Sequence, residues 1–187
     1  MSSMPSIIDS KYITGEELFE MGDIGPCELI EGRIVPMSPT GAKHGRIEVK
    51  LARILEDFVE VRNIGWVMGG EVGIFTKRQP DSVRGADVLF ISKQRLAKIP
   101  DRGFLEVAPE LVVEVRSPDE TKQDVQQKIK EYLAIGVKWV WYFEPKTRSC
   151  SIHSRTKDVQ KLAENDVLIG EEILKGFEIK ISTLFDD

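Results

Sequence analysis

Cysteine and long hydrophobic runs are the features that this 187-residue sequence has little of. Its two cysteines, Cys27 and Cys150, lie in no CxxC motif or Cys/His cluster, which argues against a disulfide framework and a zinc finger. No stretch approaches the roughly 18 apolar residues of a membrane span, and the N-terminus lacks the charged start and apolar run of a secretory signal. We therefore expect a cytoplasmic protein with no membrane partner.

Positive charge is also scarce. Lysine and arginine number 26 against 31 acidic residues, which gives a net charge of -5. This balance argues against a protein that holds nucleic acid mainly by a bulk positive field. A phosphodiester partner would need local basic patches or a metal to offset the repulsion. With 41% hydrophobic residues and no internal repeat, the sequence predicts one domain over residues 1–187, with its core at about 26–145.

Helix and strand signals alternate along the chain. Thr14 and Glu17 resemble a capping box that opens a short helix ending near residue 21. A helix is predicted at 43–62 with one buried face, and a second at 121–135 that ends at Gly136. A hairpin is predicted around Glu31, and strands at 71–76, 86–92, 110–116, 138–143, 151–153 and 177–181, with a turn before residue 86 and a polar connection at 93–103. The buried face of the first long helix is predicted to hold Ile47, Leu51, Ile54, Phe58 and Val61. This order predicts a mixed α/β fold, a central mixed sheet flanked by helices, with extra N- and C-terminal strands.

Glu114 interrupts the apolar strand LVVEV at residues 111–115. Side chains alternate between the two faces of a strand, so Glu114 shares a face with Val112. Both faces are otherwise apolar, which predicts a central strand that is covered on both sides. A buried carboxylate needs a cation, either from the protein or from a metal. A structural ion pair with Arg116 or a lysine is one interpretation, and a functional site is the other.

A second acid of the same kind favours the functional interpretation. Asp87 is predicted to open another apolar strand, ADVLFIS, after the turn-like DSVRG. Two carboxylates on two strands, with a backbone carbonyl, supply the oxygen ligands that Mg²⁺ prefers. Asp87 and Glu114 are therefore the predicted metal ligands.

Five stretches of the sequence carry a family resemblance. They are CELIEGRIV, KHGRIEVKLARIL, VRGADVLFIS, GFLEVAPELVVEVRSPDE and DVQQKIKEYLAIGVKWVWYFEP, followed by GFEIKISTLF near the C-terminus. In this order they resemble the Uma-type restriction endonuclease family of the PD-(D/E)XK nuclease superfamily. Ala86 stands where the family has proline, which leaves the neighbouring carboxylate in place.

The resemblance implies a restriction-endonuclease-like core and a catalytic lysine. Arg116 occupies the position of the superfamily's lysine, whereas Lys128 matches the lysine that close relatives carry on the following helix. The alternative for Lys128 is a surface pair with Asp124, four residues before it. Lys130 lies on the opposite flank of the helix and is the poorer candidate.

Further candidates lie in the N-terminal half. By resemblance Glu28 completes the metal site or positions a water molecule, and the alternative is a solvated hairpin residue. Arg84 is expected to contact phosphate. His44 is predicted to point toward the sheet. There it either has a satisfied hydrogen bond or contacts the residues that bind the metal. Lys43 and Arg46 begin a basic stripe that continues through Lys50 and Arg53 and either follows a phosphate backbone or is a solvated face.

The function that the resemblance implies is phosphodiester hydrolysis assisted by Mg²⁺ or Mn²⁺, with no covalent intermediate. Nucleic acid is the expected partner, with DNA favoured over RNA, and the resemblance is compatible with a homodimer. A module with the same fold that binds nucleic acid or assembles without cutting is the alternative. A two-carboxylate glycosidase would leave the lysine and the strand arrangement unexplained.

Overall fold

A mixed β-sheet of eight strands forms the centre of the protein. The computed structural model describes residues 12–118 and 120–185. The strand order is β2-β1-β4-β5-β6-β7-β8, with β3 beside β4. β5 and β6 run parallel, and the other paired strands of this sheet in the described residues run antiparallel. The strands are β1 (Cys27–Ile30), β2 (Arg33–Pro36), β3 (Gly65–Lys77), β4 (Ser82–Ser92), β5 (Leu111–Val115), β6 (Trp139–Glu144), β7 (Ser149–His153) and β8 (Gln160–Leu162).

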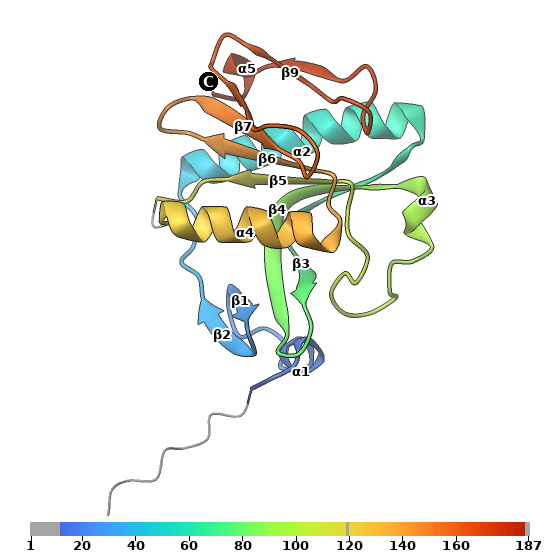
Figure 1. The fold of residues 1–187 in the computed structure, drawn as a ribbon, viewed down its shortest axis with the longest axis vertical. Coiled ribbons are helices and arrows are strands. Elements are labelled where there is room, and N and C mark those ends of the chain that lie inside the picture. Colours follow the sequence, from blue (N-terminus) through green and yellow to red (C-terminus); the bar gives the residue numbers. More distant parts are fainter. Residues whose placement is uncertain (1–11, 119, 186–187) are drawn as a thin grey trace, which may run out of the picture.

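Two long helices cover opposite faces of this sheet, so the predicted layered α/β fold is confirmed. In Figure 1, α4 (Lys122–Ile135) lies in front of the strands and α2 (Ala42–Arg62) lies behind them. Leu111, Val113 and Val115 pack into the core on the α2 side, whereas Val112 packs into the core on the α4 side. The predicted alternation along this strand is therefore confirmed. Within 12–118 and 120–185, no helix combines the length and apolar character needed to cross a bilayer.

The predicted boundaries of α4 are correct because its end signals are local. Thr121 and Asp124 form a capping box at the start, each side chain accepting a hydrogen bond from the other residue's backbone N–H. At the end, Gly136 adopts a left-handed conformation with φ of 103°. The predicted capping box of Thr14 and Glu17 is also present, and α1 (Gly15–Glu20) follows it.

The predicted buried face of α2 is wrong at its C-terminal end. Leu55 and Val59 are buried, whereas Val61 is 82% exposed. Val61 follows Val59 by two residues, which rotates it about 200° around the helix axis and turns it to solvent. The other predicted residues are buried or partly buried against the core, namely Ile47, Leu51, Ile54 and Phe58.

The turn predicted before residue 86 is also wrong. Residues 82–85 belong to β4 and pair with β3, so Asp87 lies in the middle of a strand and does not begin one. Gly85 faces Gly73 across this pair, and a Cβ on Gly73 would lie 2.3 Å from the ring of Phe104. The glycines here allow close approach of side chains and do not mark a turn. The predicted polar connection contains the short helix α3 (Lys93–Leu96).

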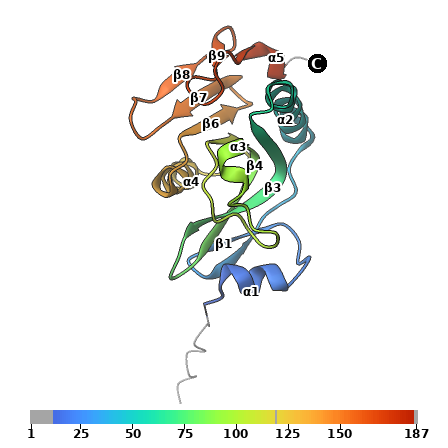
Figure 2. The ribbon, with the colours of Figure 1, turned by 90° about the vertical axis from the view of Figure 1, so that its right-hand side faces the viewer.

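The predicted extra C-terminal strands are present, and they both extend the sheet and cover part of it. β7 and β8 extend it, whereas β9 (Val167–Ile169) and β10 (Glu178–Lys180) form a separate two-stranded sheet, followed by α5 (Ser182–Phe185). Leu168 and Ile179 of this small sheet pack into the core on the α2 side. Figure 2 shows α5 next to α2 at the same end of the molecule.

Candidate metal centre

The candidate site fills a gap in the central sheet. One edge of β4 pairs with β1 at Leu29↔Val83 and with β5 from Val88↔Val113 onward. Between these points, Gly85 has no strand partner on this edge among the described residues. Its N–H donates to Glu28 Oε1 at 3.1 Å, and its carbonyl accepts from the Tyr132 hydroxyl at 3.1 Å. Side chains from β1 and α4 therefore enter the sheet here.

The two predicted metal ligands meet at this gap. The register of β4 and β5 pairs Val88 with Val113, so the next position along the strands places Asp87 opposite Glu114. Both residues are buried, with exposed fractions of 3% and 5%. Asp87 Oδ2 accepts the N–H of Val115 at 2.6 Å, which orients its carboxylate where the two strands separate.

Glu114 is held by two side chains of α4. Lys128 Nζ lies 2.8 Å from Glu114 Oε2, and the Tyr132 hydroxyl donates to Glu114 Oε1 at 2.8 Å. Burial raises the pKa of Glu114 well above its usual range, although the positive charge of Lys128 opposes this. Burial alone would lower the pKa of Lys128, but the charge of Glu114 holds it well above its usual value. Lys128 therefore faces the site as a cation and makes no surface pair with Asp124.

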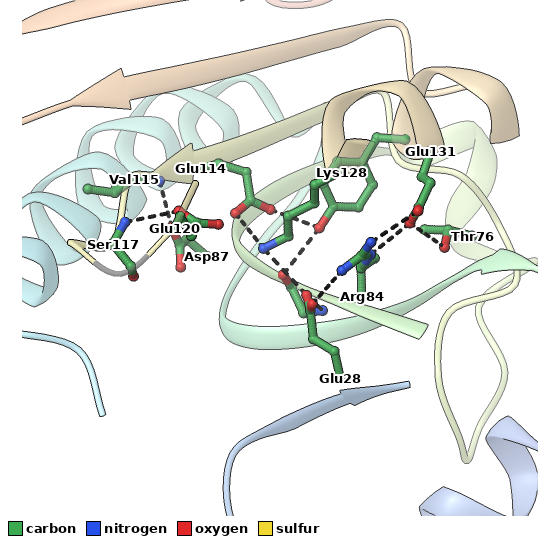
Figure 3. Close-up of polar contacts among 12 residues, drawn as sticks. Glu28, Thr76, Arg84, Asp87, Glu114, Val115, Ser117, Glu120, Lys128 and Glu131 are labelled. Carbon is green, nitrogen blue, oxygen red and sulfur yellow. Dashed lines mark hydrogen bonds and ion pairs between the residues drawn. The ribbon is translucent and has the colours of Figure 1, made fainter. Parts of the chain in front are cut away.

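Glu28 is a buried member of the site and is not a solvated hairpin residue. It is 7% exposed, and its Oε1 lies 3.5 Å from Lys128 Nζ. Arg84 fixes it, because the guanidinium donates to Glu28 Oε2 at 2.8 Å and from Nε to Glu131 Oε2 at 2.7 Å. Arg84 is thus buried between two carboxylates. Figure 3 shows Glu28, Glu114 and Lys128 converging, with Arg84 between Glu28 and Glu131.

Glu71 is an additional acid that the sequence reasoning missed. It lies at a β-bulge of β3, between Gly69 and Val72, with φ of 61°. Its Oε2 lies 2.5 Å from where a Cβ on Gly85 would be, so the glycine makes room for the carboxylate. Burial of the Glu71 carboxyl and the charge of Asp87 raise the pKa of Glu71 to about 7. The residue as a whole is exposed, but its carboxyl group points toward Gly85 and is largely removed from water.

His44 and Glu48 reach Asp87 from α2. His44 is 5% exposed, and its Nε2 lies 3.3 Å from Asp87 Oδ2. Burial alone would lower the pKa of His44, but the hydrogen bond to Asp87 and the nearby charges raise it. Glu48, one helical turn after His44, was not predicted. Burial and the charge of Asp87 raise its pKa.

Three predicted residues lie outside this cluster. Arg116 pairs with Glu144 at 2.5 Å instead of with Glu114. Lys43 and Arg116 line a pocket of about 610 Å³ that His44 also lines. Arg46 is exposed on α2, and Lys130 is exposed on α4. The pocket thus brings Lys43 and Arg116 near the site without placing them in it.

The residues present fit a divalent cation. Asp87 lies opposite Glu114, and one ligand atom each from His44, Glu48 and Asp87 lies within 4.8 Å of the others. Burial raises the pKa of Glu48, Glu71 and Glu114 above the ordinary value of a carboxyl group, because each carboxyl is partly or fully removed from water. Oxygen donors of this kind are the ligands that hard divalent cations prefer.

The mixed α/β fold thus places two acids and a lysine at a gap in its central sheet. The model of the Uma2 family, described as "Putative restriction endonuclease", matches residues 16–182, and the chain belongs to this family. A solved structure described as a "putative nuclease belonging to DUF820 from Anabaena variabilis ATCC 29413" is similar, with a TM-score of 0.78 and 18% identity. The match covers 92% of this chain and 97% of that chain. Among curated proteins no match was found.

Proposed function

We propose that this chain is a metal-dependent nuclease that hydrolyses phosphodiester bonds, with DNA as the substrate and Mg²⁺ or Mn²⁺ as the ion. The observation that carries the proposal is the placement of Asp87 opposite Glu114, with Lys128 in contact with Glu114. Membership of the Uma2 family, described as "Putative restriction endonuclease", supports it.

Each residue of the site has a role in this proposal. Asp87 and Glu114 would hold the ion, which when bound supplies charge to polarise the phosphate and to lower the pKa of a water molecule. Lys128 keeps its proton because Glu114 raises its pKa, so it acts as a positive charge and a donor and does not take a proton. Glu28, held by Arg84, limits where the lysine ammonium can move.

The pocket beside His44 is the proposed approach for the nucleic acid. Lys43 and Arg116 line it, and Arg46 lies one turn along the same helix from Lys43. The positive charges of Lys43, Arg46 and Arg116 would contact phosphates and position the scissile bond near Asp87. Arg84 is proposed to act through Glu28, since its guanidinium is already paired. A homodimer would supply one such site for each strand of a duplex.

A specific observation favours the second candidate function, a module that binds nucleic acid without cutting. Lys128 already pairs with Glu114 at 2.8 Å, so part of the negative charge that a metal would neutralise is compensated within the protein. In that case the ion pair would serve stability alone.

Replacement of Lys128 separates the two functions. Lys128→Met keeps most of the buried stem and removes the charge, and Lys130→Met is the matched control on the exposed face of α4. We expect Lys128→Met to slow nicking of plasmid DNA in Mg²⁺ by about 100-fold or more while it leaves metal affinity nearly intact. Lys130→Met should cut like the wild type.

Two other results would change this assignment. Loss of nicking in Arg116→Met but not in Lys128→Met would give the lysine's role to Arg116. Nicking by Lys128→Met and Arg116→Met at the wild-type rate would contradict the proposed mechanism.

A further inference from the structure

An aromatic cavity of about 200 Å³ lies between α1 and residues 100–106. In Figure 1, α1 is at the end of the molecule away from α5. Phe19, Phe75 and Phe104 line the cavity, and the ring of Phe104 meets the other two edge to face, with centroids 5.4 and 6.1 Å apart. None of the described residues that line it belongs to the metal centre. A closed cavity of about 150 Å³ holds benzene, so this one has room for a small organic group.

Two glycines make room for the rings of the aromatic cavity. A Cβ on Gly15 would lie 2.2 Å from the ring of Phe75, and a Cβ on Gly73 would lie 2.3 Å from the ring of Phe104. Any larger residue at either position would displace a ring. The shape of the cavity therefore depends on glycine at both positions.

The rim of the aromatic cavity carries more negative than positive charge. Glu16 and Glu106, which line it, share one partner, Arg78. Glu20 and Arg102 also line it and pair with each other. With the third carboxylate that Arg78 contacts, four acids face two arginines. The excess of negative charge favours a cationic ligand.

The rings already attract cations of the protein itself. The guanidinium carbon of Arg78 lies 3.4 Å from the centroid of the Phe75 ring, and that of Arg102 lies 5.6 Å from the centroid of the Phe19 ring. The face of an aromatic ring is negative and attracts positive charge. Phenylalanine rings offer no strong hydrogen-bond acceptor, so a primary ammonium among them would leave donors unpaired. A quaternary ammonium has no N–H donor and avoids this cost.

We infer that the aromatic cavity binds a small organic cation that carries a quaternary ammonium group. The three rings would surround its methyl groups, and the acids at the rim would stabilise its charge. The inference goes beyond the proposed nuclease function, because the cavity lies outside the metal centre. It holds whether or not the protein cuts nucleic acid.

Choline is the probe for this cavity, because aromatic ring currents should shift its N-methyl protons upfield in ¹H NMR titrations with the full chain. We expect 3,3-dimethylbutan-1-ol, which has a neutral carbon in place of the nitrogen, to bind about tenfold more weakly. Phe104→Leu keeps the site apolar but removes a ring, and should weaken choline binding by about tenfold. Glu106→Gln should weaken it by about threefold, because it removes charge at the exposed rim. Glu172→Gln, at an exposed position away from the cavity, should bind choline like the wild type.

The results that would overturn this inference are specific. Equal binding of choline and its neutral analogue would show an apolar cavity without preference for a cation. Unchanged choline binding by folded Phe104→Leu would contradict the role of the rings. If circular dichroism shows that Phe104→Leu is unfolded, Glu106→Gln decides the question, because it must weaken choline and leave the neutral analogue unaffected. A trimethyllysine peptide that binds more tightly than choline would contradict a free cation as the ligand. These titrations involve no cleavage, so their outcome is independent of the nuclease proposal.

Discussion

Glu114 is tolerated in an apolar strand because side chains of the next helix complete its surroundings. The sequence predicts that a buried carboxylate there needs a cation, and Lys128 is that cation. Arg116, the neighbour on the same face by alternation, lies beyond the end of β5 and pairs with Glu144. The resemblance to a family pointed to Lys128, whereas spacing alone favoured a surface pair with Asp124.

Two acids near Asp87 were not predicted, for different reasons. Glu48 follows His44 by one helical turn, and this i,i+4 spacing was a usable signal for a shared ligand position. Glu71 depends on a β-bulge and on close approach to Gly85, which are tertiary features. Gly69 and Gly70 before it were the only local hint of a bulge.

The raised pKa of Glu71 predicts a pH dependence of stability in the metal-free protein. Its folded-state pKa is about 7 against an ordinary value of 4.5. Between about pH 4.5 and 7 the folded chain therefore holds a proton that the unfolded chain has released, and stability falls as pH rises through this window. Glu48 and Glu114, with raised pKa values, act in the same direction. Glu71→Gln should make the decline shallower.

Urea unfolding in EDTA at several pH values between 4.5 and 7 measures this effect. The exposed Glu172 supplies a matched control, and Glu172→Gln should leave the wild-type slope unchanged. A slope in Glu71→Gln equal to that of the wild type would show that Glu71 has an ordinary pKa in the folded protein.

Elements whose ends carry local signals were predicted best. α4 starts at its capping box and stops at Gly136, as the sequence indicates. The starts of β3 and β4 were predicted at residues 71 and 86 but lie at Gly65 and Ser82. At the start of β4, Gly85 makes room for the carboxylate of Glu71, which lies at a bulge of β3, and does not mark a turn. A single sequence does not distinguish a glycine that allows close packing from a glycine that forms a turn.

The capping box of α4 predicts a modest stability effect from one exposed residue. Thr121→Ala removes the hydroxyl that accepts the N–H of Asp124, which should cost about 1 kcal/mol of unfolding free energy. For a chain of this size we expect the melting midpoint to fall by about 2–4 °C. Thermal melts test this with Thr156→Ala, at an exposed position outside any helix or strand, as the control. Equal midpoints for the two variants would contradict a contribution from the cap.

The whole molecule creates the site by leaving the central sheet incomplete. β1 and β5 pair with different parts of one edge of β4, and the backbone between them is satisfied by Glu28 and Tyr132. The layered fold and the family could be predicted from patterns and ordered motifs. The gap could not, because it depends on which strands pair and where each pairing stops.

Cleavage of end-labelled nucleic acid by the wild type and by Glu114→Gln is the most direct test of the nuclease proposal. Duplex DNA, single-stranded DNA and RNA would each be incubated with purified protein in Mg²⁺ or in EDTA. We predict fragments from the wild type in Mg²⁺ only, and cleavage about 100-fold slower or more by Glu114→Gln with unchanged circular dichroism. Folded wild-type protein that binds one of these substrates in Mg²⁺ and cuts none would contradict the proposal.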